Sequence, residues 1–252
     1  MTDSARPTLA GSPLGSPGDE KSTGRAVRDM FVSVAPRYDF LNHFLSAGRD
    51  IAWRKATARA LRGALERPGS LAVDVCCGTG DLAMQLSRYS AGCVLGTDFC
   101  HPMLQRARQK VSQAPRPVFF LEADTLSLPF AGNSLDVITT AFGFRNLANY
   151  AHGLGEMHRV LKPGGTLAIL EFSRISLPVI GPLFRFYFRR ILPRIGALIS
   201  GVSGPYQYLP DSVSRFPDQL ALAGMMREAG FTNVHYRNFF LGSAALHMGQ
   251  KA

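Results

Sequence analysis

The stretch Leu71-Ala-Val-Asp-Val-Cys-Cys-Gly-Thr-Gly-Asp-Leu82 decides the fold of this chain. It begins with an apolar run that contains a single acid, Asp74, and the run stops at a Gly-Thr-Gly turn at residues 78–80. An amphipathic stretch follows from Asp81 to Arg88. This order predicts a buried strand, a tight turn and a helix. The two glycines remove side chains where the backbone bends, so a ligand can approach the free N–H groups of the helix.

A second apolar run, Cys93-Val-Leu-Gly-Thr97, ends in Asp98. An acid at the tip of the second strand of an open sheet can hold both hydroxyls of a ribose, as in NAD-dependent enzymes. However, G-x-G-x-x-G is absent, and Asp81 at the start of the helix would repel a pyrophosphate. A cofactor with a ribose and a cationic centre fits better, and S-adenosylmethionine is the common one. The remaining interpretation is a strand, turn and helix without a ligand.

The composition limits the class of protein. The 252 residues, 46% of them hydrophobic, suit one large α/β domain or one with appended helices. The net charge of +10 favours an anionic partner, either nucleic acid or an acidic membrane surface. The four cysteines form no C-x-x-C pair and are expected to be reduced thiols: Cys76, Cys77, Cys93 and Cys100. With no apolar signal region near its start, the chain is predicted to be cytoplasmic.

The first 67 residues precede the strand–turn–helix stretch. Residues 1–24 are rich in Pro, Gly, Ser and Thr, which predicts a disordered tail. Residues 25–67 show helical spacing of apolar side chains, with helices expected from about Arg25, Pro36 and Arg49. Helices in this place often form a lid over a pocket. The arginines of the third helix are predicted to face solvent: Arg54, Arg59 and Arg62.

Strand and helix patterns alternate through residues 70–173, which predicts a cofactor-binding core with a parallel sheet covered on both faces. Strands are expected at 71–76, 93–97, 118–121, 135–142 and 166–170, and helices at 101–112 and 151–161. Residues 216–252 predict a last helix and two strands, 231–239 and 244–248, that close one sheet edge as a hairpin. The whole is a doubly wound, mostly parallel, Rossmann-like seven-stranded α/β fold in one domain, residues 25–252.

Residues 174–215 are an insertion expected to face substrate or membrane. Between residues 181 and 195, aromatic side chains alternate with arginines and no acid occurs. Arginines and prolines interrupt this segment well short of the roughly 20 apolar residues that a membrane-spanning helix needs. It is therefore either a helix packed on the domain with its arginines in water, or a surface that meets anionic lipid.

Four stretches of the chain resemble a known family. They are Tyr38-Asp39-x-Leu41-Asn42-x-x-Leu45-Ser46 with Trp53, Cys77-Gly78-Thr79-Gly80-Asp81-Leu82, Phe142-Gly143-Phe144-Arg145-Asn146, and Arg159-Val-Leu-Lys-Pro-Gly-Gly165 through Leu170-Glu171-x-Ser173. Leu192-Pro-Arg-Ile-Gly196 and Phe216-Pro-Asp-Gln219 extend the match. Together they resemble the ubiquinone/menaquinone biosynthesis C-methyltransferases, which are class I S-adenosylmethionine-dependent enzymes. The resemblance covers nearly the whole chain.

The resemblance implies methylation of a ring carbon of a polyprenylated quinol, either demethylmenaquinol or a methoxy-polyprenyl-benzoquinol, with S-adenosylmethionine and no metal. The cofactor-binding residues it implies or that the turn predicts are Gly78, Thr79, Gly80, Asp98, Phe99, Asp124, Thr125 and Ala141. By position alone, Asp124 suits either an adenine amino group or a turn cap. The family often has serine at 141, His at 50, and Gly or Ala at 76 and 77, so this chain departs from it at four positions.

Arg145 is the first catalytic candidate, because it follows the fourth strand at the carboxyl edge of the sheet. A quinol carbon becomes nucleophilic when the neighbouring hydroxyl loses its proton, and an arginine can stabilise the resulting phenolate. The resemblance also implies a catalytic role for Arg145 through ordered water. Alternatively, it is a structural arginine paired with an acid. Tyr38 and Asn146 are second candidates, for binding the quinol oxygens.

Two other functions stay open from the sequence. The basic charge allows a methyltransferase for nucleic acid or another small molecule, and a binding module without catalysis is the third option. The Asn-Pro-Pro-Tyr-type motif of amino-methylating enzymes is absent after the fourth strand, and no aromatic–basic RNA-binding module occurs. We therefore expect a quinol substrate, no nucleic acid, and transient contact with the inner membrane surface. Whether the protein forms a homodimer stays open. The quinone type and its tail length stay open.

Overall fold

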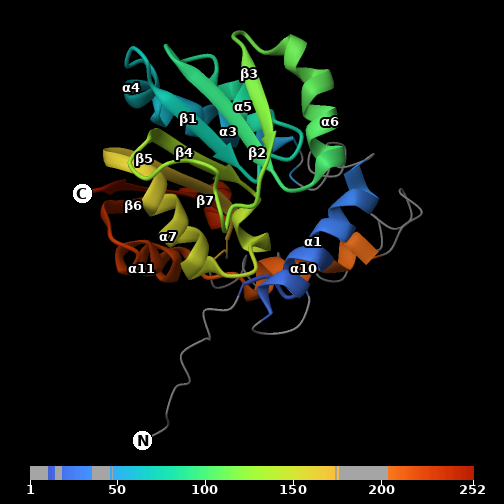
Figure 1. Ribbon diagram of the computed structural model, residues 1–252. Helices are drawn as coiled ribbons and strands as arrows, with labels where there is room; N and C mark the ends of the chain where they lie inside the picture. Colours follow the sequence, from blue (N-terminus) through green and yellow to red (C-terminus); the bar gives the residue numbers. More distant parts are fainter. Residues whose placement is uncertain (1–10, 15–18, 36–45, 47, 174, 176–203) are drawn as a thin grey trace, which may run out of the picture.

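The computed structural model describes residues 11–14, 19–35, 46, 48–173, 175 and 204–252. These contain one seven-stranded sheet with strand order β3-β2-β1-β4-β5-β7-β6 (Figure 1). The strands are β1 (Leu71–Val75), β2 (Cys93–Asp98), β3 (Val118–Glu122), β4 (Leu135–Ala141), β5 (Leu161–Phe172), β6 (Phe231–Phe239) and β7 (Ala244–Lys251).

Helices precede, connect and follow these strands. The α-helices of the described residues are α1 (Glu20–Val34), α3 (Arg49–Ala60), α4 (Arg62–Leu65), α5 (Asp81–Leu86), α6 (His101–Lys110), α7 (Tyr150–Val160), α10 (Gly204–Arg215) and α11 (Gln219–Glu228). The same part of the chain also contains the short 3-10 helices η2 (Val111–Gln113), η3 (Phe144–Asn146) and η5 (Phe240–Gly242).

The sheet is parallel from β3 to β5 and antiparallel where β7 joins β5 and β6. The chain leaves β1 towards β2 on one side and returns to β4 on the other, so the strand order reverses between β1 and β4. Crevices at such a reversal, outside the carboxyl ends of the strands, are where open α/β sheets bind ligands. The topology therefore places the candidate site at the ends of β1 and β4.

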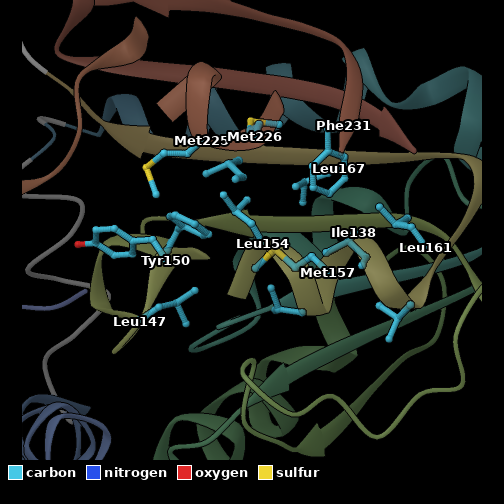
Figure 2. Close-up of a cluster of buried hydrophobic side chains, with 14 of the residues drawn as sticks. Ile138, Leu147, Tyr150, Leu154, Met157, Leu161, Leu167, Met225, Met226 and Phe231 are labelled. Carbon is cyan, nitrogen blue, oxygen red and sulfur yellow. The ribbon is translucent and has the colours of Figure 1, made fainter. Parts of the chain in front are cut away.

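Apolar side chains cover both faces of the sheet. One core packs α3 and α5 against it through residues that include Trp53, Leu61 and Leu86. Figure 2 shows the other core, in which Leu154 and Met157 of α7 and Met226 of α11 meet the strands. Burying each such side chain contributes about 1.5–3 kcal/mol. Two covered faces explain why the strands are continuous apolar runs in the sequence.

The predicted seven-stranded, mostly parallel sheet is confirmed. Three details differ. The third predicted helix is divided into α3 and α4. Strand β5 covers Leu161–Phe172, so it starts earlier than the predicted strand 166–170 and includes the Lys-Pro-Gly-Gly sequence. Helix α10 was not predicted. The C-terminal hairpin forms, and β7 is its inner strand.

The predicted end of the disordered tail, at residue 24, is wrong. Helix α1 begins at Glu20, and the side chain of Asp19 caps it by accepting a hydrogen bond from its first turn. Upstream, the amide of Ser12 donates to the carbonyl oxygen of Leu147 over 2.7 Å. The abundance of Pro, Gly and Ser masked an acid in the N-cap position and these contacts with distant segments.

The prediction that Arg54 faces solvent is also wrong. Arg54 is buried, pairs with Asp50 one turn earlier, and places its guanidinium carbon 5.2 Å from the centre of the Phe142 ring. Ser46 donates to the same Asp50 carboxylate over 2.6 Å. A paired carboxylate at position i−4 makes burial of the arginine possible. Arg59 and Arg62 are exposed, as predicted.

Two predictions fall outside the described residues: the helix from Pro36, with Tyr38, and the aromatic and arginine-rich segment 181–195. Within the described ranges, no helix has the length and hydropathy needed to cross a bilayer.

Candidate active site

A cavity with about 670 Å³ of empty space, its open mouth included, lies at the carboxyl ends of the parallel strands. Its walls come from α1 and from the turns that follow β1, β2, β3 and β4. The lining residues are Glu20, Gly24, Phe31, Cys76, Gly78, Asp98, Phe99, Met103, Ala123, Asp124, Thr125, Leu126, Phe142, Gly143, Asn146, Leu147 and Ala148. Five of the eight predicted cofactor residues are therefore together in one cavity.

Asp98, at the end of β2, is the buried acid of this cavity. Its Oδ2 accepts from the Gly78 amide over 2.8 Å, and its Oδ1 accepts from the Cys100 amide over 2.9 Å. Burial raises the pKa of Asp98 to about 6, although these amides favour the ionised form. An ionised carboxylate offers about four acceptor sites, so Asp98 can still accept from two hydroxyls.

Asp74 stabilises the glycine turn through hydrogen bonds to the helix and the strand next to it. Its Oδ2 accepts from the Ala83 amide in the first turn of α5 over 3.1 Å, and its Oδ1 accepts from the Thr139 hydroxyl of β4 over 2.7 Å. Burial raises the pKa of Asp74 to about 7. One carboxylate thus connects β1, β4 and α5. Sequence reasoning assigned it no role, although a lone acid in an apolar run was the signal.

The glycine turn is shaped by close packing as well as by ligand access. Gly80 has φ of 81°, and a Cβ there would lie 2.8 Å from the Phe120 ring. Next to it, the hydroxyl of Thr79 accepts from the Lys110 ammonium over 3.1 Å, and Lys110 also pairs with Asp81. Thr79 and Gly80 are not among the lining residues. Thr79 and Gly80 both help to form the turn. Their contact with cofactor remains a prediction.

Two lining residues that are not glycine have positive φ: Cys76 after β1 with 51°, and Phe142 after β4 with 60°. Non-glycine residues in this region are strained and gather at functional sites. A Cβ on Gly143 would lie 2.4 Å from the Cβ of Cys76, so these two strand ends approach each other closely. Burial raises the pKa of the Cys76 thiol, which therefore stays neutral.

The turn after β3 combines both roles considered for Asp124. Its Oδ1 accepts from the Leu126 amide over 2.9 Å, which is a turn-capping contact, and the residue also lines the cavity. Thr125 beside it is buried, with its hydroxyl 3.3 Å from the Cys76 sulfur. Ala141, the remaining cofactor candidate, lies in β4 and is not among the lining residues.

Arg145 lies behind the cavity wall. Its Nη1 is 3.1 Å from Glu171 Oε2 and donates to the Phe142 carbonyl oxygen, while its amide donates to Glu171 Oε1 over 3.1 Å. Burial raises the pKa of Glu171, and the arginine opposes that shift. The pairing with an acid, one of the two alternatives for Arg145, is present, whereas Asn146 lines the cavity. The structure therefore separates these neighbours: one faces the cavity and one supports its wall.

The sequence profile of the ubiE/COQ5 methyltransferase family matches residues 19–251. This chain belongs to that family. It is 46% identical over 235 residues to the demethylmenaquinone methyltransferase of Deinococcus radiodurans, covering 93% of this chain and 96% of that protein. It is 48% identical over 223 residues to the enzyme of the same name from Thermus thermophilus, covering 88% and 100%. The Geobacter sulfurreducens ubiquinone/menaquinone biosynthesis C-methyltransferase is 40% identical over 232 residues, covering 90% and 89%.

Solved structures share the fold at low sequence identity. A methyltransferase from Thermotoga maritima, described as a possible histamine N-methyltransferase, has a TM-score of 0.64 and 18% identity, covering 90% of this chain and all of that one. The [4+2]-cyclase SpnF has a TM-score of 0.63 and 18% identity, covering 96% and 98%. These similarities establish the fold alone. Among the described residues, no group of three or more His, Cys, Asp or Glu could hold a metal ion.

In this ubiE/COQ5 site, sequence reasoning missed three residues: Asp74, which holds the glycine turn, and Glu171 and Tyr208, which contact Arg145 and Asn146. Tyr208 of α10 donates its hydroxyl to Asn146 Oδ1 over 2.7 Å. Glu171 lies in Leu170-Glu171-x-Ser173, one of the stretches that resemble the family, but the sequence does not indicate that it pairs with Arg145. Tyr208 carried no signal, because its role depends on a contact between residues 62 positions apart.

A pH dependence of cofactor affinity follows from Asp98. Its ionised form accepts ribose hydroxyls best, so affinity for S-adenosylmethionine should be full above the raised pKa of about 6 and fall as the pH drops below it. Asp98→Asn should weaken binding about 10- to 100-fold at neutral pH and flatten this pH dependence. Isothermal titration calorimetry between about pH 5 and pH 8 measures both effects. Parallel pH curves for the two proteins would contradict the assignment, because Asp74 is ionisable in both.

Proposed function

We propose that this chain transfers a methyl group from S-adenosylmethionine to a ring carbon of demethylmenaquinol, giving menaquinol. Membership of the ubiE/COQ5 family and the names of the relatives at 46% and 48% identity support the menaquinone substrate. The observation that carries the proposal is the cavity, which joins the buried acid Asp98 on one side to the amide side chain of Asn146 on the other.

The chemistry of the lining suits this cofactor. Asp98 can accept from the ribose hydroxyls, and Asp124 can accept from an adenine amino group. The apolar side chains of Phe99, Met103 and Leu126 suit the faces of the adenine ring. S-adenosylmethionine supplies a methyl group that its sulfonium already makes electrophilic. The acids in the wall favour such a cation.

The protein must then make the quinol carbon nucleophilic and align it. A quinol hydroxyl that ionises pushes charge onto the neighbouring ring carbon, so a group that stabilises the phenolate accelerates the reaction. Asn146 is the proposed donor to this oxygen, and the buried Arg145 is the proposed source of positive potential behind it. Tyr38, outside the described residues, stays a proposed second contact with a quinol oxygen.

Helix α1 is the proposed lid of this site. It contributes Glu20, Gly24 and Phe31 to the cavity wall and packs beside α6 (Figure 1). The Glu20 carboxylate accepts from the Asn149 amide group over 2.8 Å, and Arg28 pairs with Glu122 over 2.9 Å. The Arg28–Glu122 pair is exposed and therefore weak, and the Glu20–Asn149 contact is partly buried. Moving the helix away to admit ligands would break these contacts and would also expose apolar side chains such as Val27, which is fully buried.

The alternative of nucleic-acid methylation is disfavoured by the charge of the cavity. Three acids line it, Glu20, Asp98 and Asp124, and phosphate groups near them would be repelled. The excess of positive charge in the whole chain is better explained by an acidic membrane surface.

Incubation of the purified protein with isotope-labelled S-adenosylmethionine and a short-tailed demethylmenaquinol tests the proposal. We expect label in a product whose mass matches the ring-methylated quinol. A methoxy-benzoquinol with the same tail tests the ubiquinone branch, and duplex DNA and RNA test the alternative substrates. Label in nucleic acid, or in no acceptor, would contradict the proposed function.

The role proposed for Arg145 needs a variant that does not leave a buried charge alone. Arg145→Gln would leave Glu171 unpaired, which should destabilise the fold by roughly 3–5 kcal/mol. The double variant Arg145→Gln with Glu171→Gln replaces the ion pair by a neutral pair of similar size. We expect it to fold and bind cofactor normally, but to turn over about 100-fold more slowly.

Glu171→Gln alone keeps the guanidinium but takes away its buried acid partner, so it should also destabilise the fold, and it shows the effect of breaking the pair from the other side. Thermal unfolding and cofactor affinity should be measured on all three variants. If the double variant turns over as fast as the wild type, Arg145 is a structural residue.

A candidate surface for the proposed membrane contact lies after the carboxyl end of β6, at the same end of the strands as the cavity. Phe240 and Leu241 follow β6, are 44% and 53% exposed, and both have positive φ. The Arg49 guanidinium lies 3.7 Å from the centre of the Phe240 ring. Apolar side chains with an adjacent arginine suit the boundary between lipid headgroups and acyl chains, where the prenyl tail of the substrate lies. Segment 181–195 stays a second proposed contact.

Changing Phe240 and Leu241 to serine should weaken binding to vesicles at least about tenfold, because two apolar side chains no longer enter the bilayer. Co-sedimentation with vesicles that contain anionic lipid measures this. The matched control changes Phe119 and Leu121 to serine. These side chains are 58% and 40% exposed on β3, which is the outer strand on the side of the sheet opposite to β6. Equal losses in the two double variants, or no loss in the first, would contradict this surface.

A further inference from the structure

Tyr208 connects the site to two segments that are distant in sequence. Its hydroxyl donates to Asn146 Oδ1 over 2.7 Å and lies 3.0 Å from the Ser12 hydroxyl. Tyr208 is half-buried on α10 and is not among the residues that line the cavity. It therefore touches a lining residue without itself reaching the cavity.

Two contacts set the direction of the Asn146 amide: the Phe142 carbonyl oxygen at its Nδ2 and the Tyr208 hydroxyl at its Oδ1. Asn146 Nδ2 lies 3.4 Å from it, a long contact, but one that requires a donor. Arg145 also donates to this oxygen. If the amide were turned, Oδ1 would face another oxygen there, which is repulsive. Oδ1 must therefore face Tyr208.

The direction of the remaining hydrogen bonds follows. A phenol carries one proton, and Tyr208 uses it on Asn146 Oδ1. The Tyr208 oxygen can then only accept from Ser12, so the order of donation is Ser12 to Tyr208 to Asn146. One Nδ2 proton of Asn146 points to Phe142, and its second Nδ2 proton is left for a ligand in the cavity.

We infer that Tyr208 is a positioning residue, whose hydroxyl keeps the Asn146 amide turned so that an N–H group faces the oxygen of the bound quinol. The inference rests on the proposed function. An N–H group stabilises a phenolate and lowers the pKa of the quinol hydroxyl, whereas an amide oxygen in its place would repel the developing charge. The phenol acts only through Asn146.

Tyr208→Phe tests the inference, because it removes the hydroxyl and keeps the ring. We expect kcat to fall about tenfold at unchanged affinity for S-adenosylmethionine, and the rising limb of the kcat–pH profile to move up by about one unit. Asn146→Ala should lower kcat about 100-fold, as loss of an oriented donor does. In the Asn146→Ala background, Tyr208→Phe should have no further effect.

Tyr236→Phe is the matched control, since it makes the same change on β6, where the ring lies 5.3 Å from that of His247. It should leave kcat and the pH profile unchanged. Ser12→Ala removes the donor to Tyr208, together with a long 3.4 Å contact to the Leu14 amide, and should give a smaller fall in kcat. It keeps the test usable if Tyr208→Phe does not fold.

Effects of Tyr208→Phe and Asn146→Ala that multiply in the double variant would overturn the inference, as would an unchanged pH profile in an otherwise slower Tyr208→Phe enzyme. If the wild type methylates no quinol, the proposed function fails instead, and the two failures are distinguishable.

Discussion

Two buried carboxylates at neighbouring strand ends hold the turn on which the site depends. Asp74 accepts from the Ala83 amide beneath the turn, and Asp98 accepts from the Gly78 amide beside it. Each is a charge-assisted bond, about twice as strong as a neutral one. Burial raises the pKa of both acids, to about 7 and about 6. Their ionised forms destabilise the empty protein, so stability should decline as the pH rises from about 4 towards these values.

Behind Phe142, which lines the cavity, lies a stack of aromatic rings and buried arginines. The rings of Phe142 and Phe172 are 4.6 Å apart between centres. The Arg54 guanidinium lies over the first ring and the Arg145 guanidinium over the second, at 5.2 and 5.5 Å. Each arginine is paired with its own buried acid. Such pairs add little net stability, but losing one partner is costly, so they hold the wall in one arrangement.

Short sequence patterns predicted the order of strands and helices, because such patterns reflect interactions between residues that are close in sequence. The apolar run to Asp74, the glycine turn and the acid Asp98 predict a strand, a turn and a candidate ligand acid within about thirty residues. The burial of Arg54 and the direction of the Asn146 amide could not be predicted this way. They depend on partners brought together only by the complete fold, such as Tyr208, which is 62 positions from Asn146. The start of α1 was missed because composition outweighed a single capping acid, Asp19.

A crystal structure with S-adenosylhomocysteine and a short-tailed demethylmenaquinol analogue tests the account most directly. We expect the ribose hydroxyls on Asp98 and one quinol oxygen within hydrogen-bond distance of Asn146 Nδ2, with Tyr208 still bonded to Oδ1. A ribose bound away from Asp98, or a quinol ring without contact to Asn146, would contradict it.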